Sequence, residues 1–280
     1  MRKSRLDVRP LSGAGGAEIF GVDVAQDLDD DTVRDIRDAL NEHCVVFFRD
    51  QQIDVARHKA FARKFGPLFI HPNYGTTGDD PEVVMVRREP GDAGHIGEDW
   101  HTDTTMVAEP PMGAILYGID VPPYGGDTMF ANQYLAYESL SDGLRKTLDG
   151  LVGVSSSAKA DVSKTREDAL KRAGGSGATP NHIVAEHPLV RTHPETGRKA
   201  LYTSVAHTAH IKGWTEKESL PLLQFLWDHQ VKPEFTCRFR WQVGSLAFWD
   251  NRCAMHNPIN DYHGFRRIMH RVTLEGDKPK

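Results

Sequence analysis

His101 and Asp103 are the residues of this sequence whose types and spacing most clearly suggest chemistry. In an extended strand the side chains at positions i and i+2 point to the same face, so we expect the imidazole and the carboxylate to lie side by side, with Thr102 on the other face. Such a pair supplies two ligands of the 2-His-1-carboxylate arrangement, which binds non-haem Fe(II) and leaves coordination positions open. Because His-x-Asp occurs by chance in many chains, the prediction of a metal site depends on a third ligand.

The candidate for the third ligand is His256, which follows the apolar stretch 245–250 and a turn-forming Asp-Asn pair. We expect it where a strand restarts. A single histidine in such a place is more often a core residue than a ligand. Together with His101 and Asp103, however, it completes the set of residue types that Fe(II) takes in facial sites.

Two arginines follow in the segment 264–273, which reads as a strand. In a strand Arg267 and Arg271 share one face with Met269. Guanidiniums on an otherwise apolar face need anionic partners, because an unpaired buried charge costs several kcal/mol. The fork geometry of arginine favours a carboxylate or a sulfonate bound through two hydrogen bonds. The alternative is a surface strand with solvated arginines.

The composition is that of an ordinary globular protein, with 280 residues, 39% hydrophobic and 26% charged. A net charge of −5 argues against a nucleic-acid partner. No run of about 18 apolar residues exists, so we expect no membrane span, and the basic start is followed by no apolar signal region. Three cysteines without a CxxC pair favour a reduced, cytoplasmic location.

The apolar patterns predict many short strands and a few peripheral helices. Two strands are expected around the glycines of 5–25, and others at 44–49, 83–88, 112–120, 127–130, 200–202, 235–241 and 245–250. Helices are expected at 29–43, 54–65, 141–151 and 215–227. The third has a cap at Ser141, and the fourth opens with a capping box of Thr215 and Glu218. With no βαβ alternation, this order favours an antiparallel two-sheet barrel that is mainly β, in one domain spanning 1–280. Residues 155–182 are too polar for a core, and we expect a mobile lid or a solvated insertion there.

The chain resembles the Fe(II)/2-oxoglutarate dioxygenases, and more narrowly the taurine dioxygenase group. The resemblance rests on the metal-ligand pattern, on Arg267 eleven residues after His256, and on pieces spread over nearly the whole chain. These pieces are 21–23, 65–67, 100–103, 125–128, 193–198, 249–252 and 267–271. The resemblance implies a double-stranded β-helix (jelly-roll) core.

The resemblance also implies roles for individual residues. His101, Asp103 and His256 would bind Fe(II), and the far carboxylate of the cosubstrate 2-oxoglutarate would pair with Arg267 and Thr128. With O2 as second cosubstrate, the implied reaction hydroxylates the substrate while 2-oxoglutarate becomes succinate and CO2.

The substrate pocket is less defined by the resemblance. Arg271 matches a position that contacts the cosubstrate or the substrate anion, and His71 and Tyr74 match residues that line the taurine pocket. At His207 an aromatic residue is expected in close relatives, so this imidazole either pairs with an anion or packs. The alternative for His71 and Tyr74 is a loop with a surface aromatic residue.

The expected activity is therefore hydroxylation of a small organic anion, with a sulfonate such as taurine, releasing sulfite, as the first expectation. The loop 87–100 looks more like that of phenoxypropionate-type members, so an aryloxyalkanoate or an alkyl sulfate ester is the alternative substrate. An inactive anion-binding relative and a zinc hydrolase with the same ligands are the rival classes. A homo-oligomer is plausible for the family.

Overall fold

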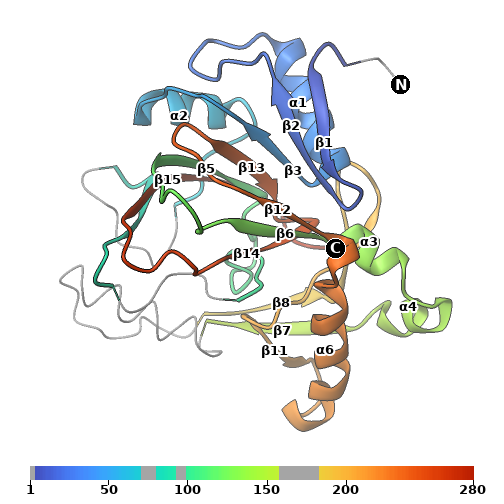
Figure 1. Cartoon of the computed structure of the whole chain (residues 1–280). Helices are drawn as coiled ribbons and strands as arrows, with labels where there is room; N and C mark the ends of the chain where they lie inside the picture. The colour runs from blue at the N-terminus through green and yellow to red at the C-terminus, as the bar shows by residue number, and fades with distance from the viewer. Residues whose placement is uncertain (1–3, 71–79, 93–98, 158–182) are drawn as a thin grey trace.

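The structure is a computed structural model that describes residues 4–70, 80–92, 99–157 and 183–280. His71, Tyr74 and most of the expected insertion at 155–182 lie outside these residues. The secondary structure of the described residues is mainly strands, arranged as stacked sheets with helices at the periphery (Figure 1).

The largest sheet has seven strands in the order β1-β2-β3-β13-β5-β15-β4. Their bounds are β1 Asp7–Ser12, β2 Gly15–Phe20, β3 Val45–Phe48, β13 Leu246–Asp250, β5 Gly113–Asp120, β15 Arg267–Leu274 and β4 Val83–Arg88. Neighbouring strands are antiparallel except β2 and β3, which pair in parallel and are connected in the sequence by a helix. This pair forms a single βαβ unit, an exception to the expected order without βαβ alternation.

A second sheet of three strands, β12-β6-β14, lies beneath the inner face of the first (Figure 1). Its strands are β12 Thr236–Phe239, β6 Thr128–Asn132 and β14 Ala254–Pro258. Aromatic rings fill the space between the sheets: Phe47 stacks on Phe239 at 4.0 Å and meets Phe130 edge-on at 5.7 Å. Two mainly antiparallel sheets packed face to face confirm the expected jelly-roll core.

Helices α1 (Asp30–His43) and α2 (Val55–Arg63) cover the outer face of the seven-stranded sheet. The sheet is therefore buried on both faces, and strand β3 shows the consequence. Val46 and Phe48 pack under the helices, whereas Val45 and Phe47 point between the sheets. This explains why 44–48 is continuously apolar instead of alternating.

The remaining elements form a third layer. It contains a sheet β11-β7-β8, a hairpin of β9 and β10, and helices that pack on these strands. The bounds are β7 Val152–Ser156, β8 Val184–Pro188, β9 Val190–Thr192, β10 Lys199–Leu201, β11 Thr208–Ile211, α3 Gln133–Glu138, α4 Asp142–Leu148, α6 Glu216–Gln230 and the 3-10 helix η1 Pro233–Phe235.

Local signals set the ends of the helices. Thr215 and Glu218 form the expected capping box at the start of α6. Helix α4 starts at the predicted Ser141 cap but ends at Leu148, three residues early, because Gly150 has a φ of 86°.

Strands β7, β8 and β11 were not predicted, since their sequences are polar and lack strict alternation. Within the described residues, no helix is both long and apolar enough to cross a membrane.

His58, on helix α2, is a buried titratable group at the outer face of the sheet. It is 1% exposed, and its ring lies 6.2 Å from that of Tyr117. Burial, helped by the nearby His270, lowers the pKa of His58 to about 3. The unfolded chain therefore binds a proton at this residue at a higher pH than the folded chain does, and stability is lost as the pH falls from about 6.5 toward 3.

We expect His58→Met to reduce this loss. Between about pH 6.5 and pH 4.5 the free energy of unfolding should fall by about 2 kcal/mol less in the variant than in the wild type. Urea denaturation at several pH values measures the difference, with His263→Gln, at an exposed histidine, as control. An identical pH dependence in His58→Met and wild type would show that this histidine is not kept neutral by burial.

Candidate active site

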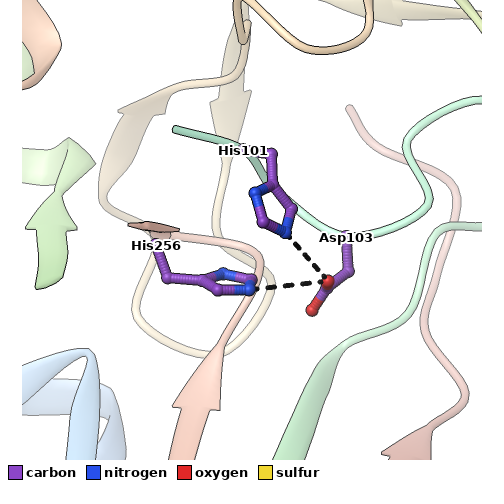
Figure 2. Close-up of side chains that lie close together, drawn as sticks. All are labelled: His101, Asp103 and His256. Carbon is purple, nitrogen blue, oxygen red and sulfur yellow. Dashed lines mark ion pairs between the residues drawn. The ribbon is translucent and has the colours of Figure 1, made fainter. Parts of the chain in front are cut away.

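His101, Asp103 and His256 come together although they lie on two distant segments of the chain (Figure 2). The Nε2 atoms of His101 and His256 lie 3.8 and 3.7 Å from the same carboxylate oxygen, Oδ1 of Asp103. The three ligand atoms all lie within 4.8 Å of one another. This spacing, from two imidazoles and one carboxylate, is what a small divalent ion needs in order to bind all three at once.

Backbone hydrogen bonds hold the two histidines side by side. His101 and His256 form an isolated antiparallel bridge in which each N–H donates to the other's carbonyl, at 3.0 and 2.9 Å. His256 belongs to β14, so the second sheet fixes the register of the site. The prediction that His101 and Asp103 share a regular strand is wrong, because the chain turns at Asp103. Positive φ angles at Asp99 (90°) and Thr104 (50°) flank the pair and bring both side chains inward.

Hydrogen bonding and burial set the protonation of the two imidazoles. Nδ1 of His101 lies 2.9 Å from the carbonyl oxygen of Asp99, and since a carbonyl can only accept, Nδ1 carries the proton. Its Nε2 is then left with a lone pair directed at the site. Burial and the neighbouring His101 lower the pKa of His256 well below its usual range, which keeps this ring neutral. Neutral imidazoles are the form that binds metals.

Asp103 is held through its second carboxylate oxygen. Oδ2 accepts a hydrogen bond from Nε1 of Trp249 at 3.2 Å and forms an ion pair with Nη2 of Arg271 at 2.6 Å. Burial alone would raise the pKa of Asp103, but the charge of Arg271 and its hydrogen bond outweigh burial and hold that pKa well below its usual range. The carboxyl is therefore ionised, with Oδ1 facing the histidines.

Trp249 has a positioning contact that sequence reasoning missed. In the sequence it stands out only as part of the stretch 249–252 that carries the family resemblance. A buried indole N–H needs a hydrogen-bond acceptor, however, and this need indicates a polar partner in the core. Arg271, which was expected to contact the cosubstrate or the substrate anion, lies with its guanidinium carbon 5.3 Å from the Trp249 ring centre. The two residues form one support for Asp103.

Arg267 and Thr128 lie together beside Trp241, on strands β15 and β6. Arg267 is 5% exposed, and its Nε and Nη2 have no hydrogen-bond partner among the described residues. Thr128 accepts a hydrogen bond from Nε1 of Trp241 at 2.9 Å, which leaves its own hydroxyl hydrogen to donate. Burial lowers the pKa of Arg267, and the nearby Tyr262 and Asp127 offset only part of this. Unsatisfied buried donors of this kind fit a carboxylate ligand.

The structure places one further predicted residue next to the metal-ligand candidates. His207 is buried, and its ring lies edge-on to that of His101 with 6.4 Å between ring centres. His71 and Tyr74 lie outside the described residues.

A second group of ligand-type residues, His193, Asp250 and Cys253, was not predicted as a unit. Nδ1 of His193 accepts two backbone N–H groups, so its Nε2 donates to Asp250 at 3.1 Å. Asp250 also pairs with Arg252 through Nε and Nη2, and Arg252 reaches Glu195 at 2.8 Å. Both ring nitrogens of His193 and both carboxylate oxygens of Asp250 already have hydrogen-bond partners, whereas Oδ1 of Asp103 faces only the two histidines, so we describe this cluster as a buried ion-pair network. It anchors the turn between β13, which carries Trp249, and β14, which carries His256.

Comparisons with known proteins agree with this geometry. Residues 7–273 match the family described as "Taurine catabolism dioxygenase TauD, TfdA family". The chain belongs to this family. It is 36% identical to the α-ketoglutarate-dependent sulfate ester dioxygenase of Pseudomonas putida, over 98% of this chain and 91% of that protein. It is 31% identical to the α-ketoglutarate-dependent 2,4-dichlorophenoxyacetate dioxygenase of Cupriavidus pinatubonensis, over 96% of both chains.

A solved structure of a taurine dioxygenase from Burkholderia xenovorans superposes with a TM-score of 0.83. The two chains are 42% identical, with 98% of this chain and 90% of the other covered. Membership confirms that the protein is an oxidoreductase of the 2-oxoglutarate-dependent dioxygenase class, and it implies Fe(II), 2-oxoglutarate and O2.

The ion-pair network predicts a large stability difference between two acidic residues. Asp250→Asn leaves Arg252 buried with a weakened partner, and we expect the free energy of unfolding to fall by about 3–5 kcal/mol. Asp149 pairs with Lys199 at the surface, and Asp149→Asn should cost at most about 1 kcal/mol. Chemical denaturation followed by tryptophan fluorescence measures both. Equal small losses would mean that the network does not stabilise the fold.

Proposed function

We propose that His101, Asp103 and His256 bind Fe(II), that Arg267 and Thr128 bind the far carboxylate of 2-oxoglutarate, and that the enzyme hydroxylates a small organosulfur anion. The observation that carries the proposal is the convergence of three ligand atoms within 4.8 Å, with the non-ligating oxygen of the carboxylate held by the protein. The proposed arrangement leaves one face of the metal for the cosubstrates.

The residues of the chain prepare this site before any ligand enters. The ion pair with Arg271 keeps Asp103 ionised, and the hydrogen bond to the Asp99 carbonyl keeps His101 in the tautomer with a free Nε2. Arg267 and Thr128 offer N–H and O–H donors beside Trp241, and because both residues are buried, a carboxylate would be bound there with little competition from water. When bound, Fe(II) with 2-oxoglutarate and O2 supplies the oxidising power for hydroxylation, and 2-oxoglutarate is converted to succinate and CO2.

The substrate class is supported by the relatives and by the cationic and imidazole groups near the site. A sulfate ester dioxygenase at 36% identity and a taurine dioxygenase structure at 42% both have names that point to organosulfur substrates. Arg271 and His207, beside the metal ligands, are the described residues that we propose to face the anionic group. Hydroxylation of the carbon that bears a sulfonate or a sulfate gives a product that collapses to a carbonyl compound and releases sulfite or sulfate.

An aryloxyalkanoate substrate is the second candidate, favoured by the 31% identity to the 2,4-dichlorophenoxyacetate enzyme over the whole chain. The same hydroxylation would then release a phenol. A single dioxygenase domain, a homo-oligomer and a cytoplasmic location stay predictions.

Succinate formation with Fe(II), ascorbate and 2-oxoglutarate tests the function. The panel is taurine, pentanesulfonate, hexyl sulfate, a phenoxyacetate and both phenoxypropionate enantiomers. We expect a sulfonate or the sulfate ester to raise succinate above the substrate-free background, and Asp103→Ala to abolish turnover. His101→Ala should abolish turnover as well, and His43→Ala, at the end of α1, is its matched histidine control, which should keep the wild-type activity. Stimulation by the aryloxy acids alone would transfer the proposal to that class, and turnover in Asp103→Ala would refute the metal assignment.

Arg267 provides a separate prediction about the cosubstrate. Arg267→Ala removes the cation that we assign to the far carboxylate, so the KM for 2-oxoglutarate should rise by about 100-fold or more, and the KM for the primary substrate much less. The adjacent Arg266 is exposed and pairs with Asp120 at 2.5 Å, so Arg266→Ala is the control. A larger effect on the primary substrate than on 2-oxoglutarate would assign Arg267 to the substrate instead.

A further inference from the structure

Two buried arginines lie directly opposite each other on neighbouring strands. In the antiparallel pairing of β15 with β4, Arg267 is the register partner of Arg88. Arg88 and Arg267 are 6% and 5% exposed. Residues that face each other in this way have neighbouring side chains on the same face of the sheet, and like charges in such a pair are destabilising. The arrangement needs an explanation beyond packing.

The hydrogen bonds of Arg88 tie down the loop that connects β14 to β15. Its Nη1 donates to Oδ1 of Asn260, and its Nη2 lies 3.3 Å from Nδ1 of His263 and 3.4 Å from the carbonyl oxygen of Asp92. Within the described part of the chain, neither Arg88 nor Arg267 forms an ion pair with a carboxylate. The donors of Arg88 are thus directed to the loop, whereas Nε and Nη2 of Arg267 stay without a partner there.

Tyr262, in the same loop, contacts both guanidiniums. The centre of its ring lies 4.7 Å from the guanidinium carbon of Arg88 and 5.8 Å from that of Arg267, and the residue is 6% exposed. An aromatic ring attracts a cation at this range, most strongly when both are desolvated. The ring therefore offsets part of the repulsion between the two arginines and fixes the position of each.

The backbone of Gly126 packs closely against both Tyr262 and Arg267. A Cβ atom at this position would lie 3.1 Å from Cδ1 of Tyr262 and 3.4 Å from Nε of Arg267. Its backbone N–H also donates to Oδ1 of Asp261 at 2.7 Å, which joins the 125–128 segment to the loop. The guanidinium of Arg267 is therefore restrained by a ring, a backbone and the neighbouring Trp241.

We propose that Arg88 and Tyr262 are positioning residues for the cosubstrate site: they hold Arg267 with its unpaired edge toward the far carboxylate, and they make the site selective for 2-oxo acids with a second carboxylate. The inference rests on the proposed role of Arg267. Arg88 acts through Tyr262 and the loop, and its charge adds to the local potential that attracts a dianion. Neither residue takes part in the chemistry at the metal.

Binding of two inert ligands to the Mn(II)-loaded full chain tests this proposal. N-oxalylglycine carries a far carboxylate, and oxamate has the same chelating group without it. Calorimetric titration gives both dissociation constants, and their ratio measures how strongly the far carboxylate is recognised. We expect Tyr262→Leu to lower the preference for N-oxalylglycine about tenfold with oxamate unchanged. Tyr124→Leu is the matched control, because Tyr124 is 60% exposed and packs edge-on against Phe265 of the same loop.

Arg88→Gln tests the role of Arg88 without changing the Tyr262 ring. Glutamine keeps a side-chain amide that can donate to Asn260, and it removes the positive charge. It should also lower the preference, by about threefold or more. Circular dichroism and thermal melting identify any variant that does not fold. If either Tyr262→Leu or Arg88→Gln does not fold, the ligand preference of the other variant decides whether the positioning role holds. An unchanged ratio, or an equal loss for both ligands, would overturn the positioning role. A wild-type protein with no preference for N-oxalylglycine would instead refute the assignment of Arg267.

Discussion

The buried carboxylate of Asp103 is the group on which the rest of the site depends. It lies between two imidazoles and a guanidinium, and its two oxygens face different partners. Removing any one partner changes the balance between burial, which favours the neutral acid, and the surrounding charges, which favour the carboxylate. Trp249 and Arg271 hold Oδ2 of Asp103, and this contact directs Oδ1 toward the two histidines.

The two-sheet architecture makes this placement rigid. His256 and Thr128 come from the smaller sheet, whereas Arg267 and Arg271 come from the larger one. Aromatic packing between the two sheets fixes the distance between them. The backbone bridge between His101 and His256 then joins the segment that carries His101 and Asp103 to the smaller sheet. The buried network around Asp250 anchors the turn that joins β13 to β14, so a cluster outside the metal site restrains one of its ligands.

Much of the fold followed from the sequence because its signals are local. Apolar runs marked β3, β5 and β13, and capping residues marked α4 and α6. The ligand candidates were also predictable, because few residue types bind Fe(II) and their spacing is restrictive. The local geometry at His101 and Asp103 could not be predicted in this way, since the chain turns there and a bridge to a distant strand orients the pair.

Contacts set by long-range register were beyond sequence reasoning. Nothing local predicts that Arg88 faces Arg267, because that pairing depends on how β4 aligns with β15. The same holds for Trp249 and Asp103, which are separated by 146 residues. The parallel pair β2 and β3 was missed because a single βαβ unit leaves little trace among antiparallel strands.

The facing arginines also connect ligand binding to folding. Like charges on buried, facing side chains lower the stability of the folded chain, and a dianion that binds the folded form raises that stability by mass action. With Arg267 in its proposed role, the midpoint of thermal unfolding then rises with the concentration of 2-oxoglutarate, so the residues that select the cosubstrate also link its binding to folding.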